Sequence, residues 1–166
     1  MSMDKDTVEK LLLSHVLSHL DFCCVLYYAC PGFLLKKLQR VQNFAARLLT
    51  GTKYQEHITP VLNGLKWLNV TNFIFYRYAM LVYKCVNCEM PLYLNELISL
   101  YMPSRSLRSE ADILLQIPRY NKLIGQKAFS VSAPKIWNSL PRGVRLSYTL
   151  AIFKLKLKNY LLQTQM

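Results

Sequence analysis

Two groups of residues in this chain have the spacing of metal ligands. His15, His19 and Cys23 follow one another at four-residue intervals, so a helix would place all three on one face, as zinc ligands can be. Cys85 and Cys88 have C-x-x-C spacing, but no second pair of ligands follows to complete a structural zinc site. Both groups are therefore interpreted as ordinary helix residues with reduced, mostly buried thiols. No metal or other cofactor is expected in this chain.

Basic residues beside aromatic ones form a second kind of candidate site. Lys and Arg neutralise phosphates, and aromatic rings can stack on unpaired bases. The aromatic neighbours are Tyr101, Tyr120, Phe129 and Trp137, of which Phe129 and Trp137 are expected in the core together with Ile136. The candidate nucleic-acid-binding residues are Lys36, Lys37, Arg40, Arg47, Arg105, Arg108, Arg119, Lys122, Lys127 and Lys135.

The charge of the chain is uneven. Its 166 residues have a net charge of +12, of which +3 belongs to residues 1–100 and +9 to residues 101–166. A basic region of this density favours a polyanion such as RNA or DNA, because binding releases counterions. A basic face can also serve only to keep a protein soluble.

Motifs for independent catalysis are absent from the sequence. There is no P-loop, no dinucleotide-binding glycine fingerprint and no G-x-S-x-G motif, so an independent enzyme is not expected. The polar start of the chain and its interrupted apolar stretches predict neither a signal peptide nor a membrane span. An intracellular protein with no membrane partner is expected.

The apolar periodicity predicts helices over most of the chain. Residues 6–20 repeat apolar side chains every fourth position after Asp6, a plausible N-cap, and the helix is expected to continue to Cys30, where Pro31-Gly32 stops it. A helix this apolar must be buried or paired with something else. The next helix, 33–49, is expected to end before Gly51 and to present one apolar face made of Leu34, Leu38, Val41, Ala45 and Leu48.

Further helices are expected in the remaining sequence, together with one irregular region. Thr59 and Pro60 predict the N-cap and first residue of a helix within 57–68. The other expected helices cover 70–87, a short segment after Pro91, 132–140 and 149–163. Residues 101–127 are polar and basic, and Ile113–Ile117 within them can form a short strand or β-hairpin. The expected fold is therefore mainly α, a helical bundle with a helical region 1–100 and a basic region 101–166, which are expected to form one compact unit.

Several ordered motifs resemble the region that follows the polymerase core in LINE-type (non-LTR) retrotransposon reverse transcriptases of the jockey-like kind. The motifs are SHLDFCCVLYYACP (18–31), LQRVQNFAARLLTG (38–51), HITPVLNGLKWL (57–68), YMPSRSLRS (101–109) and GQKAFSVSAPKIWNSLP (125–141). The last closely matches the family's G-x-R-AFSVAAPKLWNSLP run, with Lys127 in place of its Arg. The resemblance spans about residues 14–163. Asn69 and Phe73 depart from the family pattern, which usually has Pro and a basic residue there.

The resemblance implies a transposable-element RNA-directed DNA polymerase whose chemistry lies elsewhere. Reverse transcriptases hold two divalent metals on palm aspartates, and this sequence has only Asp4, Asp6, Asp21 and Asp112, with no Asp-Asp pair. The palm and the endonuclease of the parent are therefore expected outside this chain. The expected role is that of a non-catalytic thumb and carboxy-terminal fragment that contacts RNA and DNA without sequence specificity. If the chain is part of an active element, it is expected in the cytoplasm and the nucleus. The alternative is a retroelement fossil, or a captured protein-interaction module whose missing partner was the palm.

Overall fold

The computed structural model describes residues 4–102, 113–122 and 124–165, without the side chain of Lys5. Every regular element among these residues is helical, which confirms the mainly α fold. The chain divides into two compact units: unit 1 comprises Met1–Ile74 and Tyr160–Met166, and unit 2 comprises Phe75–Asn159. The division falls inside the two helices α5 (Val70–Val86) and α9 (Leu150–Thr164).

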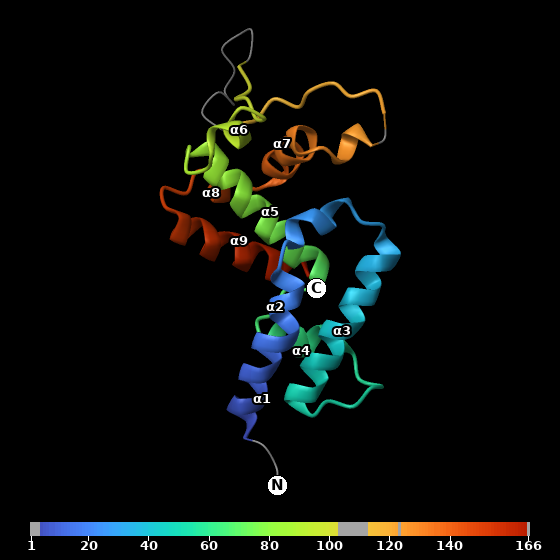
Figure 1. Ribbon diagram of the computed structural model, residues 1–166. Helices are drawn as coiled ribbons and strands as arrows, with labels where there is room; N and C mark the ends of the chain where they lie inside the picture. The colour runs from blue at the N-terminus through green and yellow to red at the C-terminus, as the bar shows by residue number, and fades with distance from the viewer. Residues whose placement is uncertain (1–3, 103–112, 123, 166) are drawn as a thin grey trace. The chain divides into compact units, whose positions relative to one another are not determined.

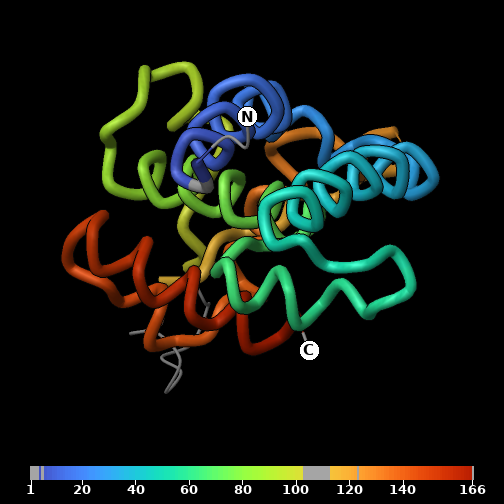
Figure 2. The backbone as a smooth tube through the Cα atoms, turned by 90° about the horizontal axis from the view of Figure 1, so that it is seen from below, coloured from blue at the N-terminus to red at the C-terminus, as the bar shows by residue number. Residues whose placement is uncertain are grey.

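Unit 1 is built around the long helix α3 (Gly32–Thr50). It is preceded by α1 (Lys5–Leu12), the π-helix η1 (Leu13–Leu17), α2 (Ser18–Asp21) and the 3-10 helix η2 (Cys24–Ala29), and followed by α4 (Ile58–Gly64). Figures 1 and 2 both show α1 and α3 side by side. A core cluster of Leu12, Ala45 and Leu49 joins these two helices.

The π-helical turn explains how the first helix keeps one apolar face toward α3. Residues four apart in an α-helix drift around the axis by about 40° at each step, because a turn holds 3.6 residues. A π-helical turn holds more residues and offsets this drift. Val8 and Val16 consequently pack against the same cluster as Leu12, although all three are spaced at four-residue intervals.

The prediction that this first helix continues to Cys30 is wrong. The α-helix ends at Asp21, and Cys23 has a φ of 51°, in the left-handed region that interrupts a helix. Neither Gly nor Pro marks this break in the sequence, so periodicity alone cannot locate it. The 3-10 helix η2 that follows buries Cys24 against Val70 and Ile74.

The predicted apolar face of α3 is also partly wrong. Leu34, Val41 and Leu48 are 38%, 47% and 56% exposed. The residues that α3 buries are Gln42, Ala45, Ala46 and Leu49. The Gln42 side chain donates a 2.8 Å hydrogen bond to the carbonyl of Leu68, which gives this polar side chain a partner inside the unit. The helix ends as predicted at Gly51, whose φ of 70° is left-handed and whose N–H donates to the Arg47 carbonyl.

Three helices begin two or three residues earlier than the sequence predicts. The N-cap of α1 is Asp4 and not Asp6, and that of α4 is His57 and not Thr59. Helix α7 (Phe129–Ser139) begins before Ser132, which places Pro134 inside it. None of these three N-caps is held by a side-chain hydrogen bond. The path of the backbone therefore sets the first residue of each helix, and the residue types that usually cap helices do not predict it.

Unit 2 packs its helices around aromatic rings. Besides its parts of α5 and α9 it holds α6 (Leu92–Asn95), the 3-10 turn η4 (Gly125–Lys127), α7 and the short α8 (Arg142–Arg145), which the sequence does not predict. Trp137 and Phe153 are 1% and 0% exposed and stack with centroids 6.0 Å apart, while Tyr83 stacks on Phe153 at 4.4 Å. The expectation that Ile136 and Trp137 are core residues is confirmed, and Phe129 is half-buried against Tyr78.

The possible β-hairpin is reduced to a single antiparallel bridge in the described part of the chain. It joins Leu100 and Leu115, with hydrogen bonds from the N–H of Tyr101 to Leu114 and from the N–H of Gln116 to Ser99. No strand occurs in the described ranges.

Candidate nucleic-acid interface

The first candidate surface is the outward side of α3 in unit 1. Lys36, Lys37 and Arg40 are exposed there, and Arg47 is half-buried one turn before the end of the helix. These four residues are called the α3 basic surface. Within the described residues, no hydrogen bond or ion pair engages the side chains of Lys36, Lys37 or Arg40. These three cations are therefore available to an anion from outside.

Arg47 is instead partly engaged at the end of the helix. Its guanidinium donates a 3.0 Å hydrogen bond to the Glu56 carbonyl and lies 5.2 Å from the centroid of the Tyr54 ring. The Tyr54 ring is itself 88% exposed. Arg47 thus supports an exposed aromatic ring beside the α3 basic surface.

The electrostatic surroundings of α3 contain few carboxylates. The helix has no acidic residue in its 19 positions, and the sequence has none between Asp21 and Glu56. Like charges on neighbouring turns repel one another, and no carboxylate of the helix itself offsets this repulsion. An incoming polyanion would relieve it.

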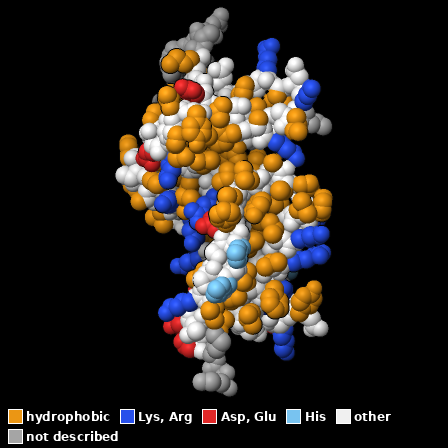
Figure 3. Space-filling view, viewed as in Figure 1, with side chains coloured by type: hydrophobic (Ala, Val, Ile, Leu, Met, Phe, Trp, Pro, Cys, Tyr) orange, Lys and Arg blue, Asp and Glu red, His pale blue; other side chains and the backbone are white. Residues whose placement is uncertain are grey.

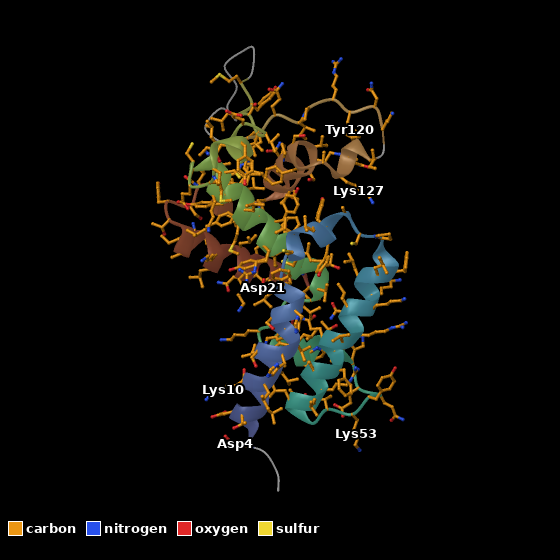
Figure 4. The ribbon with its side chains drawn as sticks, viewed as in Figure 1. Asp4, Lys10, Asp21, Lys53, Tyr120 and Lys127 are labelled. Atoms are coloured by element: carbon orange, nitrogen blue, oxygen red, sulfur yellow. The ribbon has the colours of Figure 1, made fainter. Side chains whose placement is uncertain are left out.

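The second candidate surface surrounds Tyr120 in unit 2 and is called the Tyr120 surface. The Lys135 ammonium, from α7, donates a 2.8 Å hydrogen bond to the Tyr120 hydroxyl and lies 4.4 Å from the centroid of the ring. Arg119, directly before Tyr120, is exposed, and so are Lys122 and Lys127 on the segment that runs from Tyr120 to the end of η4. Figure 4 labels Tyr120 and Lys127, which stand at the two ends of this segment. The structure thus brings Lys135 to a segment that lies well before it in the sequence.

Two side chains of α7 hold the extended residues that precede the Tyr120 surface in the sequence. The Trp137 indole N–H donates a 2.7 Å hydrogen bond to the Ile113 carbonyl. The Asn138 amide bonds the backbone of Leu115 twice, accepting from its N–H at 2.9 Å and donating to its carbonyl at 2.8 Å. Trp137 and Asn138 within the motif 125–141 therefore have a structural role, since they tie an extended segment to a helix.

The remaining predicted residues, Arg105 and Arg108, lie outside the described residues. So does Asp112. The two arginines therefore remain a prediction from the Ser-Arg-Ser-Leu-Arg-Ser sequence alone.

Sequence reasoning missed a basic surface on α9. Lys154, Lys156 and Lys158 are all exposed there, around a helix that buries Phe153 and Leu157. The Lys156 ammonium donates a 2.9 Å hydrogen bond to the Gly143 carbonyl and so joins α9 to α8. The alternation K-L-K-L-K could have revealed them, because lysines at every second position of a helix cannot all face the core.

The residues that have metal-ligand spacing in the sequence do not form a cluster of ligands in the described structure. No group of three or more His, Cys, Asp or Glu side chains within reach of one cation occurs in the part of the chain that the structure describes. His15 and His19 are exposed, and Cys23 lies beyond the end of α2 with its left-handed backbone. All five cysteines are free thiols, of which Cys85 is buried, and this burial raises its pKa. A raised pKa keeps this thiol protonated and unreactive at neutral pH.

No protein-family model, no curated protein and no solved structure matches this chain. The resemblance to LINE-type reverse transcriptases therefore rests on the sequence motifs alone. None of the helices in the described ranges is both long and apolar enough to cross a lipid bilayer.

Proposed function

We propose that this chain is a non-catalytic nucleic-acid-binding region that corresponds to the thumb and carboxy-terminal part of a LINE-type reverse transcriptase. In this role it contacts element RNA or the primer–template without sequence specificity. Polymerase and endonuclease chemistry, with its divalent metals, would belong to other parts of the parent protein.

The observation that carries this proposal is the α3 basic surface. Three cations project from one helix, each without a partner in the described structure, and the helix has no carboxylate. Lys and Arg contacts of this kind bind phosphates and release counterions whatever the base sequence is. The Tyr120 surface adds a second cationic group in unit 2, where Lys135 is already positioned by Tyr120.

A binding titration tests this proposal directly. A fluorescein-labelled RNA–DNA hybrid is titrated with the whole chain, and its fluorescence polarisation is followed from low to physiological salt. We expect binding that weakens steeply with salt and that is equal for hybrids of different sequence. Failure to bind at any salt concentration would refute the proposal. Unchanged binding by Arg105→Ala with Arg108→Ala would remove only that segment from it.

A second function is favoured by the exposed apolar side chains of unit 1. Phe22 and Leu26 are 74% and 72% exposed, and Phe33 is 62% exposed. Large exposed apolar groups are typical of a surface that another protein covers, here the palm of the parent or a captured partner. Size-exclusion chromatography with light scattering separates the two cases. A monomer that binds nucleic acid favours the first function, whereas self-association without binding favours a protein-interaction module or a fossil.

A further inference from the structure

Two exposed phenylalanines flank two cations on one line of α3. Phe33, Lys37, Arg40 and Phe44 follow one another at intervals of four, three and four residues, which places them on a single helix face. This set is called the α3 stripe. Its two rings are 62% and 69% exposed, and both cations are exposed. Figure 3 shows hydrophobic and Lys/Arg side chains next to one another over this helix.

The core does not require either ring. The face that α3 buries is formed by Gln42, Ala45, Ala46 and Leu49. The stripe lies on the opposite side of the helix. Residues three or four positions apart share a helix face, so Phe44 shares its face with Arg40 and Arg47 and not with the buried residues. Both phenylalanines therefore expose most of their surface to water, which costs free energy that a ligand could recover.

We infer that the α3 stripe binds single-stranded nucleic acid, with unpaired bases stacked on Phe33 and Phe44 and phosphates held by Lys37 and Arg40. This inference rests on the proposed function and adds the class of substrate. The two rings are eleven residues apart, about 16 Å along the axis at about 1.5 Å per residue, a length that a few nucleotides can follow. Aromatic stacking combined with backbone charge is the general mode of binding single strands.

Charge and shape favour this ligand over a duplex or a protein. A duplex keeps its bases stacked on one another, so the two rings would meet only sugars and phosphates. A protein surface would need many carboxylates to match a stretch with no acidic residue between Asp21 and Glu56. The exposed Tyr54 ring, held by Arg47, offers a third stacking position beyond the end of the helix.

The test compares strands and variants in one titration format. The whole chain is titrated into labelled oligothymidylate, oligouridylate and a mixed-sequence DNA duplex of equal length. Phe33→Ala with Phe44→Ala should weaken binding of both single strands by at least about tenfold, because each stacked base contributes substantially to affinity. The same variant should change duplex binding less than twofold.

A matched control removes exposed aliphatic side chains from the same helix. Leu34→Ala with Val41→Ala removes two apolar side chains of α3 that are also exposed, and it should leave all three affinities unchanged. Circular dichroism checks that every variant keeps its helices. A Phe44→Trp variant gives an independent signal, since a base stacked on the new indole should quench its fluorescence during the titration.

Each other outcome overturns the inference in a distinguishable way. Wild-type binding to duplex and single strand that the double phenylalanine variant does not alter refutes the α3 stripe and leaves the proposed function intact. Absence of wild-type binding to every probe refutes both. A double variant that binds normally but changes from oligomer to monomer shows that a second copy of the chain covers this face instead.

Discussion

Asn138 and Leu115 are joined like neighbours in a β-ladder, although one lies on a helix and the other on an extended segment. The amide of Asn138 accepts a hydrogen bond from the Leu115 N–H at 2.9 Å and donates one to the Leu115 carbonyl at 2.8 Å. The backbone of Leu115 is thereby satisfied on this side without a partner strand, while its side chain is only 2% exposed. One side chain of α7 thus takes the place of a neighbouring strand on the side of Leu115 that does not pair with Leu100.

Removing this amide should destabilise the chain. Asn138→Ala leaves the N–H and carbonyl of Leu115 without these partners, at a cost of about 1–3 kcal/mol in the free energy of unfolding. Urea titration followed by circular dichroism measures the change. The control is Asn121→Ala, an exposed asparagine in the same unit, which should change stability by less than about 0.5 kcal/mol. Equal effects of the two substitutions would contradict the structural role of Asn138.

The stability of the chain should fall at alkaline pH. Burial raises the pKa of Tyr83 above its ordinary value of 10.0, the Glu89 carboxylate raises it further, and a hydrogen bond with Asn87 lowers it in part. Burial likewise raises the pKa of Tyr76 above 10.0, against a smaller lowering by Arg77, and the pKa of Cys85 above 9.0.

The unfolded chain releases these protons at lower pH than the folded chain does. Stability is therefore complete below about pH 9 and is lost progressively as the pH rises through 9 and 10 towards the raised values. Urea unfolding at pH 7, 9 and 10.5 measures this loss. Tyr83→Phe should flatten the decline above pH 10, whereas Tyr148→Phe, at a 96% exposed position, should not. A flat wild-type profile up to pH 10.5 would contradict the burial of these groups.

The five thiols should differ in reactivity with a disulfide reagent such as dithionitrobenzoate. Cys23 and Cys88 are exposed, Cys30 is intermediate, and Cys24 and Cys85 are buried. The raised pKa of Cys85 slows its reaction further, since only the thiolate attacks. Absorbance should show Cys23 and Cys88 in the fast phase and all five thiols in denaturant. Cys88→Ser should remove one equivalent from the fast phase, and Cys85→Ser none. A fast phase that contains Cys85 would show that unit 2 is not packed as described.

The salt dependence of binding should identify the α3 basic surface. Lys37→Ala with Arg40→Ala should reduce the slope of log K against log salt by about 0.7–0.9 for each phosphate that the variant no longer neutralises. The control is Lys10→Ala with Lys53→Ala, which removes the same charge from two other exposed positions of unit 1. Polarisation titrations of the RNA–DNA hybrid at several salt concentrations measure the slope. Equal slopes for the two double variants would assign binding to net charge alone.

The sequence predicts the long helices well and their packing poorly, and α3 shows the reason. Its limits agree with the structure within one residue at each end, because Gly32 and Gly51 bound an uninterrupted apolar pattern. The pattern, however, contains two apolar lines on different sides of the helix. Periodicity cannot choose between them, and the small side chains of Ala45 and Ala46, which allow close approach, lie on the line that is buried.

The candidate site is predictable only as a list of cations. That Lys36, Lys37 and Arg40 share an exposed side of one helix follows from their spacing. The pairing of Lys135 with Tyr120 does not, because it depends on the path of a segment with no regular structure. The break at Cys23 is equally local, because it depends on a left-handed backbone that no Gly marks in the sequence.

One consequence of the charge distribution concerns acidity. From Ile113 to Met166 the sequence has no Asp, Glu or His, and its ionisable side chains are those of Lys, Arg and Tyr. Residue types that ordinarily gain or lose a proton between about pH 4 and 8, chiefly His and the carboxylic acids, are therefore missing from it. The positive charge of this segment therefore has no acidic or imidazole group of its own to oppose or modulate it. An anion held by it would be released by salt or by a competing polyanion, and not by protons.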